Sequence, residues 1–168
     1  MEQLKLYLND AILLEEYLND IKIDNNMLNI ICKDNYIEVI EILLKKKYKH
    51  KWEIFFRISY YAAKYDNVEI VKLITTNEYN KSNKNLNYMI ARAACENKAY
   101  NIMYYLMDLE FDKQLDIDKC IELAVNNYDL IMITNIISHK KYLPNYNLLL
   151  RNTIKADNIF LFKFFFEH

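Results

Sequence analysis

The chain of 168 residues contains no glycine and a single proline, Pro144. Glycine makes up about 7% of an average protein, so its absence is a strong bias. Without it the chain lacks the residue on which two-residue β-hairpin turns and phosphate-binding loops depend. The GxSxG motif of hydrolases and the GxxxxGKS motif of nucleotide-binding proteins are impossible for the same reason. Helices need neither glycine nor proline, and we expect them along most of the chain.

The charge is nearly balanced, and long apolar runs are missing. The 22 basic and 23 acidic residues give a formal net charge of -1, whereas a dedicated duplex-DNA binder usually has a basic excess. No stretch of about 18 apolar residues occurs, so we expect no membrane-spanning helix. The opening residues MEQLK lack the pattern of a secretory signal. We therefore expect an intracellular protein, in the cytoplasm or, as the alternative, in the nucleus.

The residues in excess are Asn, Ile, Lys, Tyr and Phe, a bias typical of an AT-rich genome. Apolar residues recur in five similar windows that begin 31, 32, 30 and 29 residues apart. Apolar or small residues recur at the third, fifth and sixth places, and a second apolar set falls at the twelfth, fourteenth, fifteenth and eighteenth places. Both sets have helical spacing, which predicts two short antiparallel helices per window. The windows are 26–43 (NMLNIICKDNYIEVIEIL), 57–74 (RISYYAAKYDNVEIVKLI), 89–106 (MIARAACENKAYNIMYYL), 119–136 (KCIELAVNNYDLIMITNI) and 148–165 (LLLRNTIKADNIFLFKFF).

A polar segment separates the two apolar sets of every window, and each of these segments contains asparagine. After glycine, Asn and Asp best tolerate the left-handed backbone that a tight turn between two helices requires. The composition of the break therefore predicts such a turn in a chain without glycine. The asparagines are Asn35, Asn67, Asn97, Asn126, Asn127 and Asn158.

Two kinds of segment lie outside the windows. Residues 6–19 contain a similar apolar helix whose first half is too short to align, and we assign residues 1–25 as an N-terminal cap. Polar connectors of 11 to 14 residues, such as 75–88 and 107–118, join the windows. Residues 1–168 are thus predicted to form a single domain. The connectors end in good helix N-cap residues, namely Asn85, Asn87, Asp116 and Asp118.

A period near 33 residues with two helices per repeat resembles the ankyrin family, whose signature joins T-P-L-H-x-A-A, a glycine-containing turn and an L-E-V-V-K-L-L helix. The segments AAKYDNVEIVKLI at 62–74 and YIEVIEILL at 36–44 fit its second helix well. The resemblance spans about residues 26–165. It implies an all-α solenoid of about five ankyrin-like helix-turn-helix repeats with an N-terminal capping helix. Such AT-rich repeats are also similar to ankyrin proteins of large DNA viruses, which implies a viral product acting on host proteins.

The departures from the ankyrin signature are systematic. The Thr-Pro pair that opens the first helix is replaced in every window, and the Gly-Ala-Asp finger is missing. The binding loops are therefore expected to differ in shape from ankyrin fingers. A TPR or HEAT array is the alternative, but the Trp, Leu-Gly and Tyr pattern of TPR is missing here and HEAT repeats are longer. The signature His is replaced by Asn29, Tyr60, Arg92, Glu122 and Arg151.

Candidate partner contacts follow from the resemblance, because the fourth place of each unit and the connectors face the groove of an ankyrin stack. Tyrosine offers a large contact area at a small entropic cost, and the chain has 15 tyrosines, although codon bias accounts for much of this number. We predict contacts to a partner protein, such as a host protein, at Trp52, Tyr60, Asn87, Arg92, Glu122 and Arg151.

A cluster of five lysines follows the second helix of the first window. Lysines near the end of a helix interact favourably with its dipole, so one interpretation is a solvated loop with a structural role. The other is a contact for an acidic protein, a nucleic acid or a nuclear import receptor. The cluster comprises Lys45, Lys46, Lys47, Lys49 and Lys51.

The last predicted helix, 159–168, carries five phenylalanines. Solenoid ends usually have a polar outer face, and five phenylalanines on one terminal helix cannot all point inward. We predict that a partner, or a second copy in a homodimer, covers this end. The alternation of the first three also permits a strand. The residues are Phe160, Phe162, Phe164, Phe165 and Phe166.

No residues show the pattern of a catalytic, cofactor or metal site. The three cysteines lack CxxC or CxH spacing, and we expect reduced thiols. Cys32 and Cys95 hold the same place two windows apart, roughly 20 Å in a stack of helices, which indicates packing residues. Cys120 is expected to be half-buried. The histidines, in connectors or at the terminus and beside no identifiable nucleophile, are His50, His139 and His168.

The pattern as a whole favours a non-catalytic module for protein–protein interaction. Two alternatives remain open: a self-assembling structural component, such as one of a virion, that uses the phenylalanine-rich helix, and a nucleic-acid binder that uses the lysine cluster. The near-neutral charge speaks against the nucleic-acid binder.

Overall fold

A computed structural model describes residues 11–20, 23–46, 51–77, 84–109, 117–139 and 145–167. This part of the chain contains eleven helices and no strand, which confirms the prediction of an all-α protein. The helices are α2 (Ala11–Asp20), α3 (Asn25–Lys33), α4 (Ile37–Lys45), α5 (Lys51–Lys64), α6 (Val68–Thr76), α7 (Lys84–Asn97), α8 (Tyr100–Asp108), α9 (Ile117–Asn126), α10 (Leu130–Ile137), α11 (Tyr146–Lys155) and α12 (Ile159–Glu167).

Every window contains two of these helices. We call the pairs α3–α4, α5–α6, α7–α8, α9–α10 and α11–α12 units 1 to 5. Helices α5 and α7 begin earlier than predicted, at Lys51 and Lys84, because Phe55 and Leu86 extend their buried faces toward the N-terminus. The connectors before these two helices are shorter than predicted for the same reason.

The predicted N-caps are wrong for three of the four connector residues. Asn85 and Asn87 lie inside α7, and Asp118 lies in the first turn of α9. Asp116 is outside the described residues. Side chains that accept a hydrogen bond from a helix N-terminus are found instead directly before the helix, at Asp24, Asn67, Asp129 and Asn145.

The turn inside each unit has the left-handed backbone that glycine usually supplies. One residue per turn has a positive φ, between 51° and 58°. The N–H group of the next residue donates to the carbonyl oxygen five residues earlier, at 2.8 to 3.0 Å in all five turns. Three of the positive-φ residues are Asn or Asp, which tolerate this region best, but Lys and Tyr hold the other two. In chain order they are Asn35, Asp66, Lys98, Tyr128 and Asp157.

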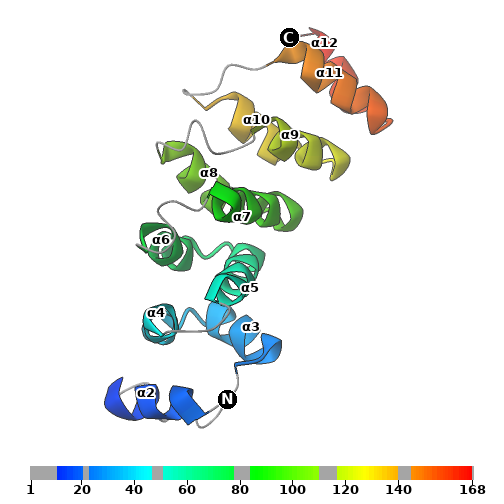
Figure 1. Cartoon of the computed structure of the whole chain (residues 1–168). Coiled ribbons are helices and arrows are strands. Elements are labelled where there is room, and N and C mark those ends of the chain that lie inside the picture. The colour runs from blue at the N-terminus through cyan, green and yellow to red at the C-terminus, as the bar shows by residue number, and fades with distance from the viewer. Residues whose placement is uncertain are drawn as a thin grey trace.

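The units stack side by side in an elongated array (Figure 1). The first helices of the units, α3, α5, α7, α9 and α11, form one row, and each packs on the next. The second helices from α4 to α10 form another row, which α2 joins by packing on α4. At the opposite end of the array, α12 packs on α11. The helix predicted as an N-terminal cap therefore belongs to the row of second helices.

Hydrogen bonds join consecutive turns. The carboxylate of Asp66 in unit 2 accepts from two backbone N–H groups in the first turn of α8, at 3.2 and 3.0 Å. The Asn67 amide donates to Asn35 of unit 1 at 2.7 Å, and the Tyr128 hydroxyl of unit 4 donates to the Ala156 carbonyl of unit 5 at 3.0 Å. The turns thus lie along one edge of the array, and the second helices that follow them run in the same direction.

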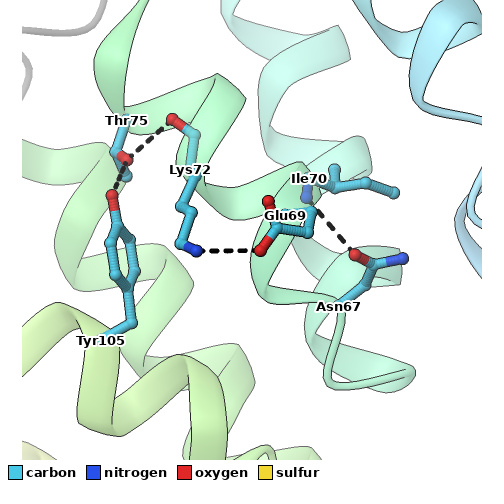
Figure 2. Close-up of polar contacts among 6 residues, drawn as sticks. All are labelled: Asn67, Glu69, Ile70, Lys72, Thr75 and Tyr105. Carbon is cyan, nitrogen blue, oxygen red and sulfur yellow. Dashed lines mark hydrogen bonds and ion pairs between the residues drawn. The ribbon is translucent and has the colours of Figure 1, made fainter.

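A further polar contact links the second helices of units 2 and 3. The hydroxyl groups of Thr75 in α6 and Tyr105 in α8 share a hydrogen bond of 2.9 Å (Figure 2). On the surface of α6, Lys72 pairs with Glu69 at 2.8 Å, and this hydrogen bond raises the pKa of Lys72. At the start of α6, Asn67 caps the helix by accepting from the N–H of its third residue (Figure 2). The contact between hydroxyls shows that Thr75 faces the following unit.

Candidate protein-binding surface

The row of first helices exposes one side chain from each of four consecutive units at the fourth place of the window. Because these places are equivalent and the helices are stacked, the four side chains lie on one face of the array. In unit 1 the equivalent residue, Asn29, is half-buried, since it accepts a hydrogen bond from the Tyr65 hydroxyl at 2.9 Å. The exposed residues are Tyr60, Arg92, Glu122 and Arg151.

Trp52 extends this face toward the start of α5. It lies two helical turns before Tyr60, and 59% of its surface is exposed. It borders a pocket of about 350 Å³ between α5 and α7. We call Trp52 together with the four fourth-place residues the first-helix surface. The other residues that line the pocket are Phe56, Asn85, Leu86 and Met89.

Charges of both signs alternate along the first-helix surface. Arg57 pairs with Glu53 at 2.6 Å, and Arg92 pairs with Glu96 at 2.8 Å. The hydrogen bond that Arg92 donates to Glu96 raises the pKa of the Arg92 guanidinium. Arg92 and Glu96 are both exposed, and an exposed pair of this kind contributes little to folding. The mixed signs suit a partner surface of mixed charge better than a polyanion.

Asn87 does not belong to the first-helix surface, and its assignment as a partner contact is corrected. Only 4% of the residue is exposed. Because α7 begins at Lys84, Asn87 lies on the helical face that also carries the buried residues Ile90 and Ala91. Trp52 also lies within a helix rather than in a connector, but its side chain remains at the surface.

The lysine cluster falls only partly within the described residues. Lys45 is exposed in the last turn of α4, and Lys46 is half-buried. Lys47 and Lys49 are outside the described part, and only the backbone of Lys51 is described. The position of Lys45 fits the interaction with the helix dipole. A role of the cluster in binding nucleic acid stays a prediction.

The three cysteines are thiols in packing positions, and none of them is in a disulfide. Cys32 and Cys95 are fully buried, as predicted. Cys120 was predicted to be half-buried and is fully buried, because it lies on the face of α9 that also buries Ala124. Burial raises the pKa of Cys32 to about 12, which keeps this thiol protonated. A protonated thiol is neither a nucleophile nor a metal ligand.

His139 follows α10, in a connector as predicted, and it is buried. Its Nε2 lies 3.3 Å from a carboxylate oxygen of Asp108, and its ring makes an edge contact with Tyr104. The hydroxyl of the neighbouring Ser138 donates to the Asn135 carbonyl at 3.4 Å. The contacts of His139 with Asp108 and Tyr104 tie units 3 and 4 together. His50 and His168 lie outside the described residues.

The phenylalanines of α12 differ in exposure, which confirms that they do not all point inward. Phe165 is buried, Phe162 and Phe164 are half-buried, and Phe160 and Phe166 are exposed. The rings of Phe162 and Phe166 stack at 5.8 Å between centroids. The alternative of a strand is wrong, because these residues form a helix.

Sequence reasoning missed the pocket beside Trp52. Its walls come from Phe56 on α5 and from Leu86 and Met89 on α7, two helices from different units. The spacing of Trp52 and Phe56, four residues apart, was a usable signal for a shared helical face. The opposite wall could not be found in this way, because it depends on how the units stack.

Within the described ranges, none of the helices has the length and apolar character needed to cross a membrane. No group of three or more His, Cys, Asp or Glu in the same ranges is arranged to hold a metal ion. Among known proteins, no family model, curated protein or solved structure matches the chain.

Proposed function

We propose that the chain is a solenoid of divergent ankyrin-like repeats that binds a partner protein on its first-helix surface and catalyses no reaction. The observation that carries this proposal is the exposed Trp52 beside an apolar pocket, on the face that also presents Tyr60 and Arg92. Trp, Tyr and Arg are the residues most enriched among those that dominate binding energy.

The ankyrin-like assignment is supported by the plan of the units. Each has two short antiparallel helices, the period is close to that of the family, and like helices stack on like helices. The positive-φ residue occupies the turn in which ankyrin repeats carry glycine. Because the chain contains no glycine, Asn35, Asp66 and Asp157 serve there instead.

A protein partner is supported by the chemistry of the surface. The pocket is bordered mainly by apolar side chains, and it can receive one apolar anchor side chain of the partner. The flanking ion pairs of Glu53 with Arg57 and of Arg92 with Glu96 offer both charges within reach of that anchor. A nucleic acid would require an uninterrupted basic face.

The experiment is affinity purification of the tagged chain from cells, followed by mass spectrometry and by titration with each purified candidate. Trp52 is the only tryptophan, so its intrinsic fluorescence reports directly on occupation of the pocket. We expect Trp52→Ala to weaken binding of the true partner by at least about thirtyfold, the loss typical of a hot-spot residue.

The matched control is Tyr104→Ala, which removes an exposed aromatic ring from α8, in the row of second helices. This variant should bind the partner with unchanged affinity. The proposal would be refuted if the affinity of every captured protein responded to Tyr104→Ala as strongly as to Trp52→Ala, or if none responded to Trp52→Ala.

A further inference from the structure

Equivalent places of units 1 to 4 and of unit 5 differ sharply in burial. The seventh place of the window is fully buried in the first four units, at Cys32, Ala63, Cys95 and Val125. The Cys32 thiol donates to the Ile58 carbonyl of unit 2 at 3.8 Å, so this place faces the following unit. In unit 5 the same place is held by Ile154, which is 65% exposed.

The second helix shows the same contrast one residue after the end of the window. Leu44, Thr75 and Met107 are buried at this place in units 1 to 3, and Ile137 of unit 4 is half-buried. Thr75 contacts the following unit through Tyr105. Phe166 of unit 5 is at the equivalent place and is 72% exposed. Unit 5 therefore retains apolar residues at the positions that other units use to receive a neighbour.

The outer side of α12 and Ile154 near the end of α11 form one surface, which we call the tail face. It is defined by Ile154, Ile159, Phe162, Lys163 and Phe166. Helical geometry places Ile159, Lys163 and Phe166 opposite the buried residues of α12. Beside them is a pocket of about 210 Å³, to whose walls Ile154, Ile159 and Phe162 contribute.

The other end of the array has a complementary surface on α2. Leu14 and Leu18 are buried against the array, while Ile12 is 72% exposed and Glu16 is exposed. Ile12 and Glu16 are one helical turn apart on the side opposite the buried leucines. With the neighbouring exposed residues Leu13 and Glu15, they define the head face.

The two faces are complementary in charge. The head face carries two carboxylates, whereas Lys163 lies at the centre of the tail face and Lys155 is exposed on the adjacent α11. Two acidic residues also belong to this end, Asp157 in the turn before α12 and Glu167 as the last residue of α12. The apolar and charged residues also have the same spacing, from Ile12 to Glu16 and from Ile159 to Lys163.

We propose that two copies of the chain associate head to tail, with α2 of one copy stacked on α12 of another. In this contact α2, which already packs on α4 at one end of the array, also packs on α12 at the opposite end of another copy. It brings Ile12 against Ile159 and Glu16 against Lys163. Because the head face and the tail face are different surfaces, a pair of copies still has one unoccupied head face and one unoccupied tail face. Further copies can therefore join at either end. The association does not depend on the first-helix surface.

The test is a mixing experiment with two blocked variants, studied by analytical ultracentrifugation over a concentration series. Ile12→Asp blocks the head, and Phe166→Asp blocks the tail. Each variant alone should associate about a hundredfold more weakly than the unmodified chain, because it places a charge in an apolar contact. An equimolar mixture should form a dimer of one copy of each, which uses the remaining intact head and intact tail.

Three outcomes overturn the proposal. They are a strictly monomeric unmodified chain at all concentrations, self-association of the Ile12→Asp variant alone through paired tails, and a mixture that stays monomeric. Ile131→Asp is the matched control, since Ile131 is an exposed isoleucine on α10, away from both ends. It should leave association unchanged, and circular dichroism of every variant verifies that the helices are intact.

A charge exchange tests the pairing of the two helices. Glu16→Lys and Lys163→Glu should each weaken association about tenfold by placing like charges opposite each other. The double variant should recover most of the loss. Failure of the double variant to associate better than either single variant contradicts the pairing of Glu16 with Lys163.

Discussion

Units 2 and 5 have the same turn chemistry and different surroundings. Each places an Asp at the positive-φ position and an Asn directly after it. In unit 2 the Asp66 carboxylate accepts N–H groups of unit 3, and the Asn67 amide donates to unit 1. In unit 5 Asp157 is exposed, and the amide nitrogen of Asn158 is buried without a hydrogen-bond partner. The same local sequence thus forms hydrogen bonds to both neighbouring units in unit 2, whereas in unit 5 it leaves a buried amide nitrogen without a hydrogen bond.

The largest expected effect is on thiol reactivity at the seventh place. The Ile154→Cys variant should react rapidly with a disulfide reagent such as Ellman's reagent, because this place is exposed in unit 5. Cys32 should react about a thousandfold more slowly at neutral pH, since its raised pKa leaves so little thiolate and the folded chain covers it. Stopped-flow absorbance measures both rates. Similar rates at the two places would remove the contrast between inner and terminal units.

The next effect in size is on stability. Phe55→Ala removes a buried ring from α5 and should lower the free energy of unfolding by about 3–5 kcal/mol. Phe160→Ala removes an exposed ring from α12 and should change it by less than about 0.5 kcal/mol. Urea unfolding followed by circular dichroism provides both values. A comparable loss for both variants would mean that α12 is covered as completely as α5.

A smaller effect concerns the pH dependence of stability. The pKa of Cys32 is about 12 in the folded chain and 9.0 in its ordinary state. Its stabilising contribution is complete below pH 9 and is lost as the pH rises toward 12, because the unfolded chain releases the thiol proton first. The unmodified chain should lose up to about 1.4 kcal/mol per pH unit more than Cys32→Ala in this range. Equal slopes in thermal or urea unfolding would contradict the assignment.

The smallest effect distinguishes two turns. Lys98 and Asn35 hold the same positive-φ place in units 3 and 1. Lys98→Gly should stabilise the chain by up to about 1 kcal/mol, because glycine adopts this backbone without the steric cost of a Cβ atom. Asn35→Gly should be neutral or destabilising by about 1 kcal/mol, since Asn already tolerates the conformation and accepts a hydrogen bond from Asn67. Chemical denaturation of both variants measures the difference, and a larger gain for Asn35→Gly would be the opposite of the expected result.

Much of the fold was predictable from local patterns. Residues such as Ile70, Val71 and Ile74 have the spacing of a buried helical face, and they form one in α6. The asparagines of the polar breaks predicted tight turns, and four of the five positive-φ residues lie in these breaks, whereas Tyr128 directly follows its break. The starts of α5 and α7 were misplaced, because the windows begin at residues 57 and 89 and the buried residues Phe55 and Leu86 lie before them.

The candidate site was less predictable, because exposure depends on packing between units. Tyr60 and Arg92 could be nominated from their place in the repeat, and both are exposed. Asn87 was predicted as a partner contact because it was assigned to a connector. Since α7 begins earlier than predicted, Asn87 lies within this helix and is buried. The pocket beside Trp52 needs a wall from the neighbouring unit, and no pattern within one window specifies that wall.

The central claim is that consecutive helix pairs stack through equivalent positions, and nuclear Overhauser contacts between the units test it most directly. Four contacts are diagnostic, each between neighbouring units: Asn29 with Tyr65, Thr75 with Tyr105, Tyr100 with Asp129, and Tyr128 with Ala156. The stacked array predicts cross-peaks for all four pairs in a selectively labelled sample. Loss of these cross-peaks while the contacts within each helix remain would contradict the stacking.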